Sequence, residues 1–178
     1  MVRAWVIPLG VILAAFAGGA ARESRLPTGG DWDEAAAREA KAEVQKGMNA
    51  FAAMDRETFK AGIAAEIVGY DLDLENQPVR LGSRDEALAY FDAMSAQVKK
   101  MGGKMKIEFR SIDCRATSTL AYATVEFDFS ATMGDGSTMS QPSRVTCVLH
   151  KGNDGWKWVH WHTSLSALPT TPPPPSGK

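Results

Sequence analysis

The 178-residue sequence lacks several features that would assign a function directly. Its formal net charge is -1, so no basic excess is available to neutralise the phosphates of a nucleic acid. A Gly-rich phosphate loop and the Gly-x-Ser-x-Gly motif of a serine nucleophile are both missing. These absences argue against nucleic-acid-binding proteins, P-loop enzymes and serine hydrolases with a nucleophile elbow.

Cysteine is also scarce, because only Cys114 and Cys147 are present. The chain can therefore form one disulfide bond at most. Such a bond would suit an oxidising compartment outside the cytoplasm. The alternative is a pair of buried thiols that pack as small apolar side chains.

The N-terminal residues follow the pattern of a secretory signal peptide. Arg3 supplies the positive start, residues 6–16 are apolar, and residues 18–21 provide the small side chains of a cleavage site. The alternative is an anchor that stays in the membrane, but the apolar run is short and no charged stop-transfer segment follows it. We expect cleavage of residues 1–21, a periplasmic or secreted protein, and no membrane association after cleavage.

The rest of the chain reads as one domain between two polar segments. Residues 22–32 are a linker by composition, and residues 168–178 include four consecutive prolines that cannot join a sheet. We predict that this tail is disordered. Residues 33–167 form the domain, and 44% of the whole chain is hydrophobic, which is enough to bury a core.

The first half of the domain predicts three helices. Apolar residues recur at helical spacing over residues 36–51 and again over residues 87–101. Asp55 begins a short helix between them, and residues 83–86 (Ser-Arg-Asp-Glu) form a capping box before the third. A strand over residues 67–74 and a turn at Asn76-Gln77-Pro78 separate the second and third helices.

The second half changes to the period-two alternation of β-strands. It contains four strands that follow one another as a meander, and glycine-rich turns at residues 134–136 and 152–155 separate the last three. Helices followed by strands indicate an α+β fold. We predict a cone-shaped roll in which three helices pack on one face of a curved antiparallel sheet, around an apolar cavity. The four strands cover residues 105–110, 121–129, 144–151 and 156–166.

The last two strands resemble a known family. Residues 144–146 (Arg-Val-Thr), His150 and residues 155–164 (Gly-Trp-Lys-Trp-Val-His-Trp-His-Thr-Ser) resemble the C-terminal signature of SnoaL-like domains of the nuclear transport factor 2-like superfamily. The association domain of calcium/calmodulin-dependent protein kinase ends similarly. The resemblance covers residues 33–167 and implies a homodimer that pairs through the sheet. We expect no cofactor.

The fold of this family also implies the state of the two cysteines. It places one strand between the strands of Cys114 and Cys147, and next-but-one strands lie about 9–10 Å apart. That separation is beyond the reach of a disulfide bond. The resemblance therefore implies free, buried thiols.

The superfamily includes ketosteroid isomerases, whose site combines an Asp base with a Tyr and a protonated Asp as oxyanion donors. The resemblance puts the base at Asp73, but it puts the two donors near Gly47 and Thr146. A base without an oxyanion hole lacks the larger electrostatic contribution. We therefore expect no isomerase of that kind, and the other interpretation of Asp73 is an exposed carboxylate at a strand end.

His160 and His162 should share one strand face with Trp156 and Trp158, because alternate residues of a strand point the same way. Together with His150 they could hold a metal, but no Cys or carboxylate completes the set, so we expect none. The kinase association domain instead implies that these two histidines face a subunit interface. Arg144 either binds an acid in the cavity or pairs with an acidic residue on the other face; we group it with the histidines as interface or structural.

A ligand pocket follows from the apolar residues that would line the cone. We expect an exported protein that binds a small apolar or amphipathic molecule without catalysis, because the catalytic set is incomplete. One alternative is an isomerase, dehydratase or cyclase that pairs Asp73 with a histidine. Another is a homo-oligomeric assembly module that uses the outer face of the sheet. The predicted pocket residues are Tyr70, Tyr90, Phe91, Met94, Phe127, Cys147, Trp161 and Thr163.

Overall fold

The computed structural model describes residues 32–73 and 76–166, which form three helices and six strands. The predicted signal peptide, residues 22–31 of the linker and the tail from 168 lie outside these ranges. No helix within the described ranges is both long enough and apolar enough to cross a membrane. The helices are α1 (Glu34–Ala52), α2 (Arg56–Gly62) and α3 (Arg84–Lys100). The strands are β1 (Ile63–Leu72), β2 (Pro78–Leu81), β3 (Lys104–Ala116), β4 (Leu120–Thr132), β5 (Thr138–Gly152) and β6 (Gly155–Leu165).

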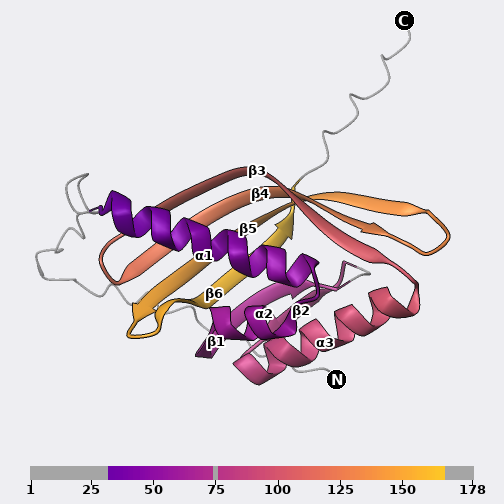
Figure 1. Ribbon diagram of the computed structural model, residues 1–178, viewed down its shortest axis with the longest axis horizontal. Coiled ribbons are helices and arrows are strands. Elements are labelled where there is room, and N and C mark those ends of the chain that lie inside the picture. Colours follow the sequence, from indigo (N-terminus) through magenta and orange to yellow (C-terminus); the bar gives the residue numbers. More distant parts are fainter. Residues whose placement is uncertain (1–31, 74–75, 167–178) are drawn as a thin grey trace, which may run out of the picture.

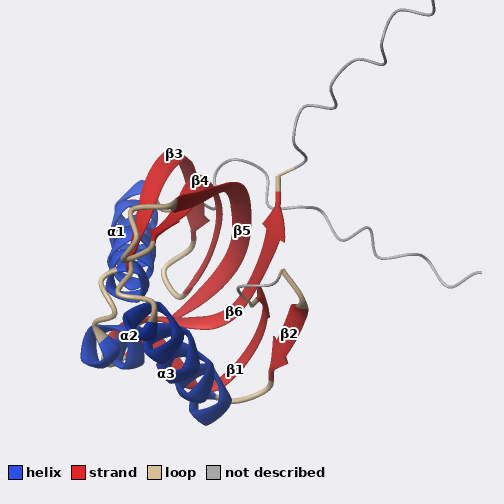
Figure 2. Ribbon diagram, turned by 90° about the vertical axis from the view of Figure 1, so that its right-hand side faces the viewer, coloured by secondary structure: helices blue, strands red, loops and turns tan. Residues whose placement is uncertain are grey.

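The strands form one curved sheet in the order β2-β1-β6-β5-β4-β3, with the three helices on its concave side (Figure 1; Figure 2). This confirms the predicted α+β roll. The sheet is mixed rather than wholly antiparallel, because β1 and β6 pair in parallel. After β2 the chain crosses through α3 to the far edge, and the meander of β3 to β6 then returns beside β1 in the same direction.

The short edge strand β2 was not expected, since residues 76–78 predict only a turn. The chain leaves that turn at Pro78 and pairs antiparallel with β1. A proline can begin such a strand because an edge strand has no partner for one row of its amide groups. The fold thus gains a sixth strand next to the one that carries Asp71.

The helix starts agree with the capping chemistry of the sequence. The carboxylates of Asp33 and Asp55 accept hydrogen bonds from first-turn amides of α1 and α2. The Ser83 hydroxyl accepts a 3.2 Å bond from the amide of Glu86, as the capping box predicts. The return bond differs, because the Glu86 carboxylate accepts from the amide of Gly82 at 2.6 Å. These caps fix where each helix begins over the sheet.

A β-bulge in β6 decides which of its residues face the helices. Adjacent residues of β5 pair with Trp158 and His160, which leaves Val159 without a partner. A bulge shifts the alternation by one residue, so Trp158 and Trp161 both face the helices while His160 faces away. The prediction that the histidines share a face with Trp158 is therefore wrong, because strict alternation does not cross a bulge.

The two cysteines are free, as the family resemblance implies. Cys114 pairs in register with Ala123, and Ala123 pairs with Cys147, so one strand separates the thiols. Cys147 is fully buried and Cys114 half-buried. Burial raises the pKa of the Cys147 thiol to about 12, so it stays protonated and packs as a small apolar side chain.

Candidate functional site

A cavity of about 120 Å³ lies between the helices and the concave face of the sheet. This is slightly less than the volume of a cavity known to hold benzene, about 150 Å³, so the cavity suits a molecule with one small ring. Most of its lining is apolar, and much of it is aromatic. The aromatic residues are Phe51 from α1, Phe59 from α2, Tyr90 from α3, Phe127 and Phe129 from β4, and Trp158 and Trp161 from β6.

Asp71 brings a carboxyl group into this apolar lining. One carboxyl oxygen accepts a 3.0 Å hydrogen bond from the indole N–H of Trp161. The other accepts a 2.9 Å bond from the backbone amide of Leu72, and the Thr163 hydroxyl also hydrogen-bonds the carboxyl group. The site is therefore a carboxyl group held by three neutral donors inside a largely apolar cavity.

Burial dominates the ionisation of Asp71. Although the residue keeps some exposed surface, desolvation of its carboxyl group raises the pKa from 3.8 to about 6. The three hydrogen bonds and the charge of His162 act in the opposite direction but do not cancel it. Asp71 is therefore mostly ionised at neutral pH and takes up a proton in mildly acidic conditions.

Gly69 explains how the Trp161 indole reaches Asp71. The two residues Gly69 and Trp161 are register partners on β1 and β6. A Cβ atom at position 69 would lie only 2.6 Å from the indole ring. The missing side chain lets the ring cross β1 and bond to Asp71, which lies two residues further along the same face.

Tyr90 closes another side of the site. Its hydroxyl donates a 2.8 Å bond to the carbonyl oxygen of Leu72, which fixes the ring beside Asp71. Burial, and then the charges of Asp71 and Asp73, raise the pKa of Tyr90 above its usual range. The phenol therefore stays neutral and continues to donate its hydrogen bond to the Leu72 carbonyl oxygen of β1.

Trp158 packs against Gly47, the position near which the resemblance to ketosteroid isomerases puts a tyrosine. A Cβ atom at Gly47 would be 3.1 Å from the indole nitrogen of Trp158. That nitrogen is buried and has no hydrogen-bond partner among residues 32–73 and 76–166. The indole thus takes the space that a larger residue at position 47 would need, and it packs edge-on against Trp161.

Most of the residues predicted for the pocket lie around this cavity. Phe91 and Cys147 do not line it: Phe91 is buried and stacks on Phe59, and Cys147 is fully buried in the sheet core. Val159 does not line it either, because it is the bulge residue. Those that line the cavity are Tyr90, Met94, Phe127, Trp161 and Thr163.

Tyr70 lies on the outer face of the sheet with the two histidines. It is 42% exposed, and its ring centre is 6.2 Å from that of His160 and 5.9 Å from that of His162. Strand alternation explains this, because Gly69 and Asp71 face inward and the residue between them must face outward. The same alternation, read from the sequence, would have identified Asp71.

Asp73 lines the cavity but is bound into its own turn. Its carboxylate accepts a 2.7 Å bond from the amide of Gln77. His160 and His162 do not line the cavity, so the hypothetical pair of Asp73 with a histidine does not form there. No group of three or more potential ligand side chains within the described ranges is placed to hold a metal ion.

Arg144 also lies outside the cavity. It is the register partner of Glu126 on β4, and its side chain donates a 3.1 Å bond to the Ser164 hydroxyl on β6. Of the two interpretations that the sequence leaves open, the structure gives the one in which Arg144 lies on the outer face. The expected ion pair with an acidic residue is not among those formed within the described ranges, where Asp128 pairs with Arg110 instead.

Solved structures share this architecture at low sequence identity. An NTF2-like protein of unknown function from Pseudomonas putida has a TM-score of 0.65 and 21% identity, covering 79% of this chain and 93% of that one. A putative dehydratase of the NTF2-like family from Streptomyces avermitilis has a TM-score of 0.66 and 15% identity, covering 76% and 99%. The association domain of CaMKII from C. elegans has a TM-score of 0.57 and 14% identity, covering 74% and 96%. At these identities the likeness shows the fold alone.

Sequence comparison identifies the family. No curated protein matches the chain significantly. A family model described as a SnoaL-like domain matches residues 41–169, which includes most of α1 and all later elements. The chain therefore belongs to the SnoaL-like domain family and has the NTF2-like fold.

Proposed function

We propose that the protein binds a small, largely apolar molecule of about one ring in the cavity and does not convert it. The SnoaL-like, NTF2-like family supports a ligand-binding or isomerase-like role. The observation that carries the proposal is an aromatic cavity with a carboxyl group, Asp71, held in place by three donors. Apolar walls with a few fixed polar groups are typical of ligand sites.

The polar groups near Asp71 favour binding over catalysis. The Tyr90 hydroxyl is used by the carbonyl oxygen of Leu72, and the indole N–H of Trp158 is buried against Gly47. The Tyr90 hydroxyl is therefore not free to stabilise an oxyanion formed beside Asp71, and within the described ranges the Trp158 N–H is the one unused donor among these two. Oxyanion stabilisation is commonly the largest catalytic contribution, so the site is better suited to holding a molecule than to transforming it.

A cavity-filling variant tests the proposal. Val145 lines the cavity, so Val145→Phe should occupy it and abolish the thermal shift caused by one-ring compounds. The neighbouring Thr146 is exposed on the outer face, so Thr146→Phe adds the same ring elsewhere and should keep that shift. If one-ring compounds stabilise both variants equally, or do not stabilise the native protein at all, the proposal fails.

A second candidate function is proton transfer by Asp71. Its pKa of about 6 inside an apolar cavity is a property shared with catalytic acids and bases. One structural neighbour is called a putative dehydratase. If Asp71 transfers protons, the native protein should speed exchange of the α-protons of cyclopentanone with deuterium oxide. Asp71→Asn should remove that activity, and exchange at the buffer rate with the native protein would reject this candidate.

We also propose export and pairing of two copies. The pattern of residues 1–21 supports export, and a mature N-terminus near residue 22 in the periplasm or medium would bear it out. The family resemblance supports a homodimer through the outer face. A monomer in light scattering would reject that pairing.

A further inference from the structure

The charges around the cavity favour a cation. Two acidic side chains, Asp71 and Asp73, line it, and no Lys or Arg from the described ranges does. Asp71 takes part in none of the ion pairs formed within those ranges. At neutral pH the inside of the cavity is therefore negative and has no built-in counter-ion.

The carboxyl group of Asp71 can accept a further hydrogen bond. An ionised carboxylate offers about four acceptor positions. Three are used by the Trp161 indole, the Thr163 hydroxyl and the Leu72 amide. A donor from a bound molecule can therefore complete the set, whereas an acceptor or an anion there would be repelled.

The aromatic walls add to the same preference. The rings of Tyr90, Trp158 and Trp161 line the cavity with Asp71. The faces of aromatic rings carry a negative quadrupole that attracts ammonium groups. Their edges and the aliphatic lining favour an apolar body. Charge and ring chemistry thus select for the same kind of molecule, one with a cationic end and an apolar remainder.

We propose that the cavity binds a small protonated amine, with its ammonium group on the Asp71 carboxylate and its apolar body among the aromatic rings. This inference rests on the proposed binding function and names its ligand class. The volume of about 120 Å³ limits the apolar body to roughly one ring or a short branched chain.

Binding of an amine should depend on pH through Asp71. The titratable groups that line the cavity with it are Tyr90 from α3 and Asp73 just after β1, and the charge of His162, on the outer face of β6, also acts on it. Protonation of Asp71 removes the charge that pairs with the ammonium group. Amine affinity should therefore fall as the pH drops through about 6, while the affinity for a neutral molecule of the same shape should change little.

The experiment compares three ligands of one shape by titration calorimetry on the mature protein. Cyclopentylamine is the cationic probe, cyclopentanol the neutral one and cyclopentanecarboxylate the anionic one. At pH 7.5 we expect the amine to bind about tenfold more tightly than the alcohol and the carboxylate to bind more weakly than either. Asp71→Asn should bring the amine to the affinity of the alcohol.

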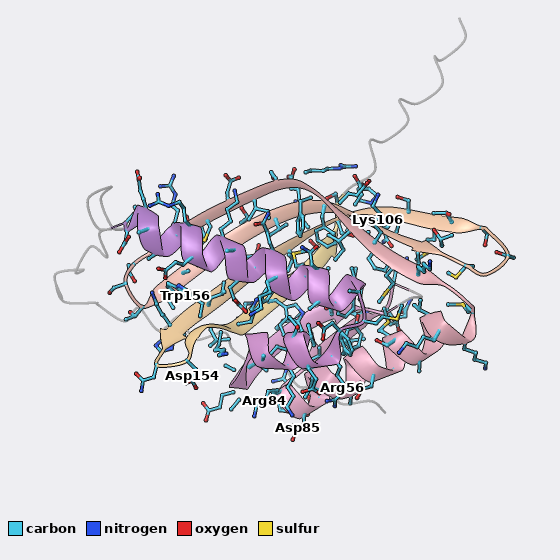
Figure 3. The ribbon with its side chains drawn as sticks, in the orientation of Figure 1. Arg56, Arg84, Asp85, Lys106, Asp154 and Trp156 are labelled. Atoms are coloured by element: carbon cyan, nitrogen blue, oxygen red, sulfur yellow. The ribbon has the colours of Figure 1, made fainter. Side chains whose placement is uncertain are left out.

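A matched control removes the same charge elsewhere. Asp85 is exposed at the start of α3 and is labelled at the outer surface of that helix in Figure 3. Asp85→Asn should keep the preference for the amine. If Asp71→Asn fails to fold, the loss of amine affinity in the native protein between pH 7.5 and 5 serves as the test.

The outcomes separate the two proposals. Equal binding of amine and alcohol, tighter binding of the carboxylate, or a pH-independent amine affinity would overturn the amine inference and leave the binding function standing. No binding of any probe would overturn both. Loss of the amine preference in Asp71→Asn but not in Asp85→Asn is the result that supports it.

Discussion

The inward and outward side chains of β6 come from the same eleven residues but lie in different environments. Trp158 and Trp161 face inward, pack against each other and line the cavity. His160 and His162 face outward beside the exposed ring of Tyr70. The bulge at Val159 creates this division, because it puts two tryptophans three residues apart on one face. The inner face lines the candidate ligand site, whereas the outer face is exposed and can contact another protein surface.

The largest effect should come from removing the space that Trp161 occupies. In Gly69→Val the new side chain would begin 2.6 Å from the indole and force it away from Asp71. We expect a loss of about 3 kcal/mol in the free energy of unfolding, measured with urea. Gly152→Ala is the control, since nothing lies within 4 Å of a Cβ atom there. Equal, small losses in both variants would contradict the close packing of Trp161 on β1.

The next effect concerns Asp71 and pH. Its pKa is about 6 in the folded protein against 3.8 as the ordinary value, so folding is favoured below pH 4 and that advantage is lost as the pH rises through 6. Asp71→Asn lacks this group. Between pH 4 and pH 7 the native protein should therefore lose about 2 to 3 kcal/mol in its free energy of unfolding relative to the variant. Parallel pH profiles for the two proteins would show that the carboxyl group is not buried.

A smaller loss is expected from the indole donor alone. Trp161→Phe keeps an aromatic ring but removes the N–H that bonds to Asp71 at 3.0 Å. The buried carboxylate then lacks one donor, which costs about 2 kcal/mol in the free energy of unfolding at pH 7. Its pKa should rise above that of the native protein, as NMR titration of the carboxyl carbon can measure. An unchanged pKa would mean that the hydrogen bond does not form.

The outer face should give the smallest effect. His162→Gln removes an exposed ring next to Tyr70. We expect the free energy of unfolding to change by less than about 0.5 kcal/mol and ligand binding in the cavity to stay the same. A loss of ligand binding as large as that of Asp71→Asn would break the distinction between the two faces of β6.

Local chemistry explains how much of the fold the sequence predicts. Capping residues such as Asp55 and Ser83 act within one turn, so the helix starts can be located without tertiary information. Strand alternation acts over two residues and locates β3 to β6. The parallel pairing of β1 with β6 depends instead on the path of the whole chain.

The site is harder to predict because it depends on which residues of different strands point to the same face of the sheet and meet there. Asp71 follows the buried residues Ile67 and Gly69 at intervals of two, so its inward direction is encoded locally. The hydrogen bond that holds its carboxyl group is not encoded locally, because the donor, Trp161, lies 90 residues further along the chain. The bulge at Val159 is likewise a product of pairing with a neighbouring strand, and strict alternation misassigns the face of Trp158.

The most direct test of the binding site uses the indole N–H signals in an ¹H–¹⁵N NMR spectrum. Trp158 and Trp161 line the cavity. Trp156 does not line it, and its indole N–H donates a hydrogen bond to Glu39 instead. On addition of cyclopentylamine, the signals of Trp158 and Trp161 should shift and that of Trp156 should stay in place. Shifts of equal size at all three positions, or no shift at any of them, would contradict a ligand site in this cavity.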